Sequence, residues 1–318
     1  MRKDSKCNER IGLIRQNKWG DTMKIIEYIN ANNIVVEFQD EYKEKKKSRY
    51  SHFVNGDIMN PHILNCRIEK ENINYQGYKM KIVQYIDSHN AIVEFQDEHK
   101  ARVHTTYQHF ESGSIKNPYS KSVLGVGMIG SKYPAKANNK HTKEYIAWRC
   151  MLVRCYDPKY KQNFPTYEDV TCCEEWLCFE NFYEWLHGQE NFDKWLNGYK
   201  WAVDKDILVK GNKVYSPDKC CLVSYEINAL FVRQSSSRGD LPIGVRERKY
   251  GYQAMCSNPY THKTEAIGRR KTIEETFDIY KLRKENLIKQ AAQEEYAKGN
   301  ITKRCYDAMM NHEVEITD

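Results

Sequence analysis

Hydrophobic and polar positions alternate with the period of a β-strand in two segments near the start of the chain. Residues 23–29 read Met-Lys-Ile-Ile-Glu-Tyr-Ile, and residues 80–86 repeat the pattern as Met-Lys-Ile-Val-Gln-Tyr-Ile. The same displacement brings Val35–Glu41 onto Ile92–Glu98. Because such alternation is typical of half-buried strands, we expect two copies of one small β unit. Each copy should be a twisted barrel or meander, the first over residues 1–64 and the second over residues 65–122.

Basic and polar stretches follow the second strand of each copy, at Lys43–Arg49 and His99–His104. Cationic side chains along a strand edge can bind phosphate, but a solvated hairpin flank has the same composition, so both interpretations stay open. A Tudor-like barrel is an analogous shape. A protein partner for these repeats is a further expectation.

The periodicity changes at Glu144 to that of a helix. Before this point, residues 123–143 are rich in Gly, Ser, Lys and Asn, which is typical of a basic linker. After it, one helical face carries Tyr145, Trp148, Leu152 and Cys155. A second helix over residues 174–186 has an aromatic stripe, which is more typical of a core than of a cofactor site.

Two arginines on the first of these helices are candidate DNA contacts. Arg149 and Arg154 lie close to its apolar face, and a guanidinium group suits a phosphate. Arg154 has a second interpretation, which is an ion pair with Asp169 or Asp204 inside the same domain.

A string of motifs runs through residues 144–233. It consists of Tyr145-x-x-Trp148-x-x-Met151-x-x-Arg154-Cys155-Tyr156, Pro165-Thr166-Tyr167, Cys173-Glu174-Glu175-Trp176, Val203-Asp204-Lys205-Asp206-Ile207, Gly211-Asn212-Lys213, Tyr215-Ser216-Pro217 and Ile227-Asn228. In order and spacing these motifs resemble a group of phage and prophage HNH-endonuclease-like proteins, and the resemblance covers about residues 145–288. The resemblance implies a ββα centre in which a strand, a loop and a helix hold one divalent metal ion.

Mapped onto this chain, the resemblance implies a strand at 200–207, a loop at 208–216 and a helix that contains Asn228. Asp204 and Asp206 are candidate ligands for Mg²⁺ or Mn²⁺, because an Asp-x-Asp pair supplies the oxygen ligands that such ions prefer, and Asn228 on the expected helix is a third candidate. Asn228 has the alternative role of a satisfied core amide.

The chain departs from the HNH pattern at the general base, since no histidine lies between His187 and His262. Three interpretations stay open. Lys205 or Asp206 replaces the histidine, or His141 folds over the site and supplies the base. In the third, the centre has lost catalysis and only binds DNA. An Asp-Lys-Asp sequence is also typical of a surface turn with an ion pair, and Asn212 is expected to be a turn residue.

A polar segment at 234–240 is expected to be a linker that lets the following module move independently. Residues 241–298 alternate as three strands and then take the helical period from residue 273 to about residue 296. The strands are expected around 245–248, 252–257 and 264–268. One face of the helix carries Ile273, Phe277, Tyr280, Leu287, Ile288 and Ala291 and should cover the sheet.

The motifs Gly244-Val245, Tyr252-x-Ala254, Ile267-Gly268 and Thr272-x-Glu274-Glu275 resemble the plant Apetala-type DNA-binding domain, which also occurs in phage homing endonucleases. The resemblance implies a three-stranded sheet that enters the major groove and a helix that supports it. Tyrosine stands at 250 and 252, near the position of the family's tryptophan. The candidate DNA contacts are Arg246, Arg248, Lys249, Tyr252, Lys263, Arg269 and Arg270. The alternative is a solvated cationic face.

The overall composition agrees with a DNA partner. Fifty Lys and Arg residues against 43 Asp and Glu residues give a net charge of +7, which is a modest bias toward polyanions. No apolar run has the length of a membrane span, and the N-terminus is polar. We therefore expect no membrane partner and a cytoplasmic location, in the host cell if the protein is phage-encoded.

Eleven cysteines are spread along the chain and are expected to be reduced. A zinc site formed by Cys155, Cys173 and Cys220 is an open alternative, although structural zinc usually draws its ligands from closely spaced pairs. The tail at 299–318 ends with acidic residues and carries no functional expectation.

The sequence thus predicts an α+β protein of several domains: two small β-barrel-like repeats, an HNH-like ββα helical centre, and a three-stranded sheet with a helix. The expected function is binding of double-stranded DNA and metal-dependent hydrolysis of its phosphodiesters. The alternative is a catalytically inactive DNA-binding regulator or a phage inhibitor of a host defence complex.

Overall fold

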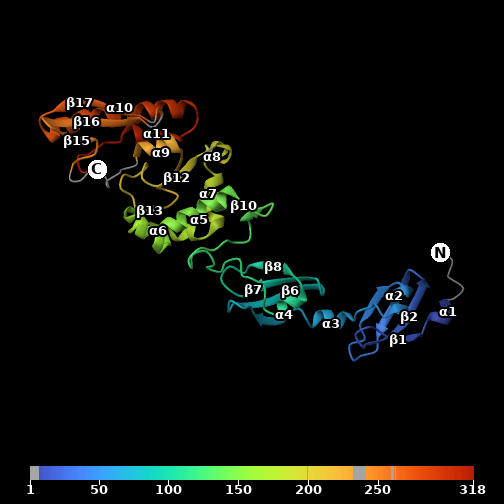
Figure 1. The fold of residues 1–318 in the computed structure, drawn as a ribbon. Helices are drawn as coiled ribbons and strands as arrows, with labels where there is room; N and C mark the ends of the chain where they lie inside the picture. The colour runs from blue at the N-terminus through green and yellow to red at the C-terminus, as the bar shows by residue number, and fades with distance from the viewer. Residues whose placement is uncertain (1–6, 199, 232–240, 259–260, 262) are drawn as a thin grey trace. The chain divides into compact units, whose positions relative to one another are not determined.

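The computed structural model describes residues 7–198, 200–231, 241–258, 261 and 263–318. The chain divides into two compact units, Met1–Ser120 and Lys121–Asp318 (Figure 1). Helices and several small sheets alternate along the chain, so the fold is α+β. The expected polar linker at 234–240 lies outside the described residues.

The first unit contains two four-stranded antiparallel sheets, and in each the strands lie side by side in chain order, so both are meanders. The first copy consists of α1 (Cys7–Arg10), β1 (Ile14–Gln16), β2 (Thr22–Asn30), β3 (Asn33–Phe38), β4 (Lys45–Ser48) and α2 (Tyr50–Asn55). The second consists of α3 (Pro61–Asn65), β5 (Glu71–Ile73), β6 (Lys79–Asp87), β7 (Asn90–Phe95), β8 (Arg102–Thr105) and α4 (Tyr107–Glu111).

Alternation along the strands gives each copy a core of its own. The pairing places Met23 opposite Phe38 in the first copy and Met80 opposite Phe95 in the second. All four side chains are fully buried, because every second residue of a strand points to the same face. The sequence repeat therefore extends to the strand register and to the core.

The second unit begins with short strands and helices and ends with a larger sheet and a long helix. Its first part consists of β9 (Lys136–Ala137), β10 (Lys140–His141), α5 (Lys143–Tyr156), α6 (Pro158–Asn163), η1 (Pro165–Tyr167), β11 (Thr171–Cys172), η2 (Glu174–Leu177), α7 (Phe179–His187) and α8 (Phe192–Asn197). Then follow β12 (Trp201–Asp204), β13 (Val214–Tyr215), β14 (Cys221–Ser224), α9 (Tyr225–Phe231), β15 (Val245–Arg248), β16 (Gly251–Asn258), β17 (Lys263–Arg270), α10 (Ile273–Ala297) and α11 (Lys303–Met310).

The aromatic stripe of α7 is part of a core that α5 shares. Trp148, Phe179 and Phe182 are fully buried in it. The expectation of a basic linker over 123–143 is wrong for this segment, since Val123 belongs to the same core and Met128 pairs with Cys178. Its few apolar side chains are enough to bind the segment to the helices, although its polar composition suggested a solvated chain.

The strands β15, β16 and β17 form an antiparallel sheet in chain order, and α10 packs against it. Phe277, Tyr280, Leu287 and Ile288 of α10 are buried, as the helical period predicted. The same core includes Val223 of β14 and Ile227 of α9. The expectation of independent motion is therefore wrong, because separating the C-terminal module would expose these side chains to water.

No helix in the described part of the chain combines the length and the apolar character that a membrane span needs. The cysteines that the structure describes are free thiols, and most of them are buried.

Substitution of Gly244 by alanine should destabilise the second unit. Gly244 has a φ of +77°, and a Cβ atom there would overlap the Tyr280 ring. The left-handed backbone and the overlap together predict a loss of about 3 kcal/mol or more in the free energy of unfolding. Gly299→Ala is the matched control, since Gly299 has a φ of +66° and open space around it. It should cost only about 1 kcal/mol. Urea unfolding measures both, and equal losses would contradict the predicted packing of Gly244 on Tyr280.

Candidate nucleic-acid interface and candidate active site

The register of the C-terminal sheet places three arginines on the face opposite α10. Arg246 pairs with Gln253, and Gln253 pairs with Arg269, so these residues form one row across the strands. Arg248 lies two residues after Arg246 on the same face, and its Nε donates a 2.8 Å hydrogen bond to Gln253 Oε1. All three arginines are exposed. We call Arg246, Arg248 and Arg269 the arginine face.

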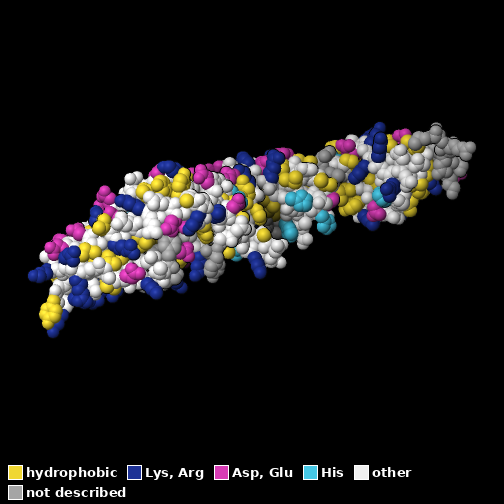
Figure 2. Space-filling view, turned by 90° about the horizontal axis from the view of Figure 1, so that it is seen from above, with side chains coloured by type: hydrophobic (Ala, Val, Ile, Leu, Met, Phe, Trp, Pro, Cys, Tyr) yellow, Lys and Arg dark blue, Asp and Glu magenta, His cyan; other side chains and the backbone are white. Residues whose placement is uncertain are grey.

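The two glutamates of these strands point to the other side. Val245 is buried in the core under α10, so Glu247, two residues later, is on the side of the sheet that faces α10. Glu265 lies 3.9 Å from Arg283 of α10. Among the residues that the structure describes, no carboxylate pairs with the arginine face. In Figure 2, Lys and Arg side chains gather around the end of the second unit that this sheet forms.

Three of the expected DNA contacts lie away from the arginine face. Tyr252 packs against the core beside α10. Arg270 pairs with Tyr252 in the register and Lys263 pairs with Asn258, so both are on the same side as Tyr252. Lys249 lies at the hairpin tip, where its Nζ is 5.2 Å from the ring of Tyr250, a side chain that is 85% exposed.

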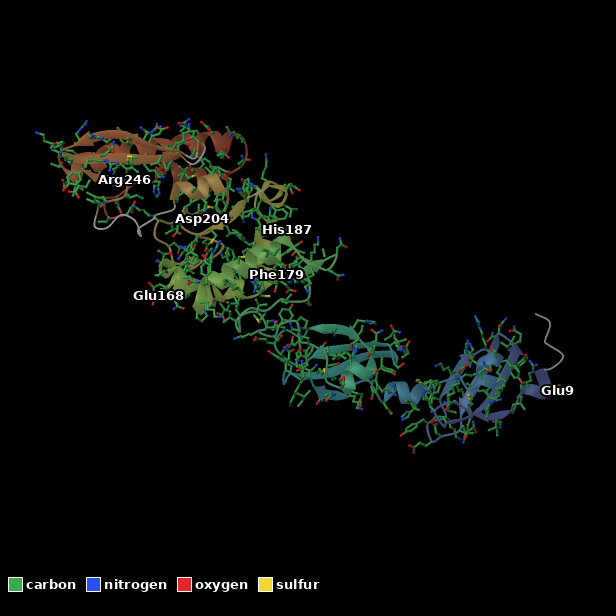
Figure 3. All side chains as sticks on the ribbon, viewed as in Figure 1. Glu9, Glu168, Phe179, His187, Asp204 and Arg246 are labelled. Atoms are coloured by element: carbon green, nitrogen blue, oxygen red, sulfur yellow. The ribbon has the colours of Figure 1, made fainter. Side chains whose placement is uncertain are left out.

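The expected ββα segment consists of β12, β14 and α9. β12 and β14 pair antiparallel, with Asp204 opposite Cys221, and α9 follows at once. The strand ends at Asp204 rather than at 207, and a second strand separates the loop from the helix. Figure 3 shows Asp204 on this segment and Arg246 on the C-terminal sheet.

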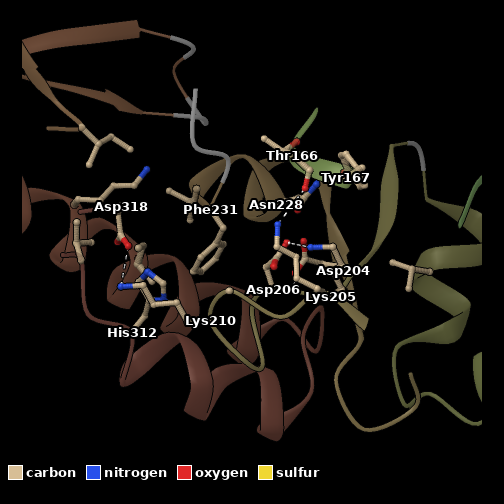
Figure 4. A pocket seen from close by; sticks show the side chains of 18 of the residues that line it. Thr166, Tyr167, Asp204, Lys205, Asp206, Lys210, Asn228, Phe231, His312 and Asp318 are labelled. Atoms are coloured by element: carbon tan, nitrogen blue, oxygen red, sulfur yellow. Dashed lines mark hydrogen bonds and ion pairs between the residues drawn. The ribbon is translucent and has the colours of Figure 1, made fainter. Parts of the chain in front are cut away.

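A cavity of about 420 Å³ lies beside this segment. Asp204, Lys205, Asp206 and Asn228 line it together (Figure 4). Sequence reasoning missed other lining residues, which come from distant segments and include Tyr167, Lys210, Lys213, Lys284 and Asp318. Tyr167 and Lys213 belong to motifs named above, but no functional role was expected for either.

Asp204 ends β12 and shapes the turn that follows. Its Oδ1 accepts 2.8 Å hydrogen bonds from the backbone N–H groups of Asp206 and Ile207. Burial, together with the nearby Asp206 carboxylate, raises the pKa of Asp204 in spite of these bonds. Asp204 also lines the cavity, and its Oδ2 atom takes no part in these two hydrogen bonds.

Lys205 is 7% exposed and forms part of a polar network. Its Nζ donates to Asp206 Oδ2 at 2.6 Å and to the carbonyl of Asn212 at 3.0 Å. Asn212 fixes the loop by donating from Nδ2 to the carbonyls of Lys205 and Val214. An ammonium group in this pairing has no lone pair to accept a proton, so the geometry places Lys205 in the ion pair of a turn. The expected turn role of Asn212 agrees with its hydrogen bonds.

Arg154 lines the cavity from α5. Its Nη1 donates to the hydroxyl of Tyr215 at 3.3 Å. Among the described residues, neither Asp169 nor Asp204 forms an ion pair with Arg154. Arg149, on the same helix, is exposed and does not line the cavity.

His141 is also absent from the lining of the cavity. It is exposed in β10, its Nδ1 lies 3.3 Å from the carbonyl of Ala135, and its ring stacks on Tyr145 at 4.6 Å. This placement does not bring His141 to Asp204 as a general base.

The acidic tail closes one end of the cavity. Lys210 Nζ lies 3.0 Å from both the Glu315 and the Asp318 carboxylates. Val314, which directly precedes Glu315, is buried, and its N–H donates to Glu285 Oε1 at 2.9 Å. The tail is thus bound to the loop after β12 and to α10.

The described residues contain no group of three or more His, Cys, Asp or Glu side chains placed to bind a metal ion. Burial raises the pKa of the Cys155 thiol to about 12 and raises that of Cys220 as well. Cys155, Cys173 and Cys220 do not form a metal-binding group among the described residues, so the zinc alternative is not supported. The oxygen atoms of Asp204, Asp206 and Asn228 are the hard ligands that Mg²⁺ and Mn²⁺ prefer, although one Asp206 oxygen is paired with Lys205.

The basic stretches of the first unit differ between the copies. Arg102 is paired with Glu94 at 2.9 Å in the second copy. In the first copy Lys45 lies 3.8 Å from Glu37, while Lys43 and Lys47 are exposed. These strand edges are therefore of mixed charge.

Comparison of the chain with protein-family models, with curated proteins and with solved structures finds no match in any of the three.

Asp204→Asn should stabilise the metal-free protein, and the gain should grow with pH. Folding raises the pKa of Asp204, so the stability linked to its proton is present at low pH and is lost as the pH rises through the raised pKa. Asparagine keeps the hydrogen-bond acceptor of the turn without the buried charge. Thermal unfolding should show a gain of a few degrees near pH ~7.5 and a smaller gain near pH ~4.5.

Asp218→Asn is the control for this pH series, because Asp218 is exposed and does not line the cavity. A loss of stability in Asp204→Asn at both pH values would mean that the charged carboxylate is required for the turn.

Proposed function

We propose that the protein binds double-stranded DNA through the arginine face and that its second unit is related to HNH endonucleases. The observation that carries the proposal is the register of β15, β16 and β17, which puts Arg246, Arg248 and Arg269 on one exposed face and the glutamates on the other. A three-stranded sheet supported by one long helix is the arrangement that the Apetala-type resemblance implies.

An unpaired guanidinium group has hydrogen-bond donors to spare for a phosphate oxygen or for a guanine edge. The three guanidinium groups on β15 and β17 can therefore contact one stretch of DNA backbone or one groove. Lys249 and Tyr250 at the hairpin tip extend this surface. Lys263, Arg270 and Tyr252 are not on it and are not included in the proposed contact.

Hydrolysis of phosphodiesters in the cavity is the second candidate function. The order strand, loop, strand and helix, with Asp204 and Asp206 at the first strand end and Asn228 on the helix, supports it. Bound Mg²⁺ or Mn²⁺ would be held by these three residues and would offset charge on the phosphate. Asp206 is then the candidate general base, once it is released from Lys205.

The alternative is a DNA-binding regulator, or a phage inhibitor of a host defence complex, that has lost catalysis. The ion pair between Asp206 and Lys205 favours it, because it occupies both side chains that were candidates for the general base. In either case the proposed place of action is the cytoplasm, of the host cell if the protein is phage-encoded. The N-terminal repeats, as barrel-like modules, are proposed to bind a protein partner.

Replacing Arg246 and Arg269 together with glutamine should flatten the salt dependence of DNA binding. If each arginine neutralises one phosphate, the slope of log K against log salt should fall by about two units. Fluorescence anisotropy with a labelled duplex at several salt concentrations measures the slope. Lys140→Gln with Lys159→Gln removes the same charge from exposed positions outside the sheet and should leave the slope nearly unchanged. Equal slopes for the two double variants would refute the proposed contact.

A plasmid assay tests the second candidate. The protein should nick supercoiled plasmid in Mg²⁺ or Mn²⁺, and Asp206→Asn and Asp204→Asn should each lose at least about 100-fold in rate. Asp218→Asn, in the loop after β13 and outside the cavity, should nick normally. Tight DNA binding without nicking by the unmodified protein would favour the inactive regulator.

A further inference from the structure

The cavity beside Asp204 is lined by parts of the second unit that are far apart in sequence. Its walls come from α5, η1, the loop after β12, α9, α10 and the acidic tail. A volume of about 420 Å³ is in the range of pockets for small molecules. A duplex is much wider than such a space, so a ligand of the cavity must be small or must be a single unit of a longer chain.

The charges that line the cavity favour an anion. Five cationic side chains and three carboxylates line it, which are Arg154, Lys205, Lys210, Lys213, Lys284, Asp204, Asp206 and Asp318. Lys205 is paired with Asp206, and Lys210 is paired with Asp318. Among the described residues, Arg154, Lys213 and Lys284 then have no carboxylate partner, and only Asp204 remains to balance them.

Arg154 is the cation best placed to bind a phosphate. It is half-buried, and the Tyr215 hydroxyl accepts one of its N–H groups at 3.3 Å. A guanidinium group has five N–H donors, so most of them are left for a ligand. A planar donor group held in place and removed from bulk water binds phosphate oxygens in pairs.

Aromatic side chains line the same cavity. Tyr167 of η1 and Phe231 of α9 are the two with partly exposed rings. Phe231 is held edge-on by His312 at 5.0 Å. Aromatic faces of this kind stack nucleobases.

We propose that the cavity binds one nucleotide, with its phosphate at Arg154 and its base against the aromatic wall. The inference rests on the proposed DNA function and names the form of the substrate. The cavity takes a single-stranded or unstacked nucleotide, whereas the arginine face contacts the duplex.

Titration calorimetry with the full chain tests this assignment with three probes: a deoxynucleoside 5′-monophosphate, the same deoxynucleoside, and inorganic phosphate. The monophosphate should bind at one site and at least about tenfold more tightly than either part, because only it engages both walls. Arg154→Gln should weaken its binding by about tenfold to a hundredfold. Arg149→Gln, an exposed position on the same helix, should have no effect.

Tyr215→Phe serves as a second variant in case Arg154→Gln disturbs the fold, which near-ultraviolet circular dichroism would reveal. It removes only the hydroxyl that positions the guanidinium group, and it should weaken monophosphate binding several-fold. Absence of saturable binding, equal affinities for the monophosphate and for phosphate alone, or no effect of both the Arg154 and the Tyr215 substitutions would each overturn the assignment.

The double substitution Arg246→Gln and Arg269→Gln separates this inference from the proposed DNA contact. It should leave monophosphate binding unchanged while it flattens the salt dependence of duplex binding. An unchanged salt dependence in this variant would mean that the arginine face is wrongly assigned. Loss of monophosphate binding in it would mean that the cavity is wrongly assigned.

Discussion

A shared apolar core is the constraint on which the second unit depends. Val223 of β14 and Ile227 of α9 are buried against Phe277 and Ile288 of α10, and each such side chain contributes about 1.5–3 kcal/mol when it is removed from water. Because of this core, the strand–helix segment and the C-terminal module form one body. The cavity consequently has walls from both, and Lys284 lines the same space as Asp204.

Within that body the polar groups near Asp204 form hydrogen bonds and an ion pair that stabilise the loop after β12. Asp204 accepts two backbone N–H groups, Lys205 is paired with Asp206, and Asn212 holds the loop across its base. Buried polar groups must be satisfied in this way or the fold loses stability. A ligand therefore meets mainly the cations that the loop does not use, Arg154 above all, and any metal ion would compete with Lys205 for Asp206.

The arginine face and the cavity differ in size and in openness, and so in the form of ligand that each can take. The arginine face is open and has no carboxylate partners in the described residues, so it suits an extended polyanion. The cavity is small and only partly open, which fits the single unit of that polymer proposed for it. The strand register produces the first surface, and packing between distant segments produces the second. The two surfaces therefore differ in the form of nucleic acid proposed for each, a duplex for the first and a single nucleotide for the second.

Local periodicity determined much of this protein from sequence alone: the two β copies, the aromatic core of α5 and α7, and the strands and buried helix face of the C-terminal module all follow from periods of two and 3.6 residues. The tertiary structure alone decided that residues 123–143 pack on a core and that α9 and α10 share one. It also bound the acidic tail to Lys210 and brought Arg154 and Lys284 to the cavity of Asp204. These contacts join segments far apart in the chain, and a local pattern holds no information about which distant surface will cover it.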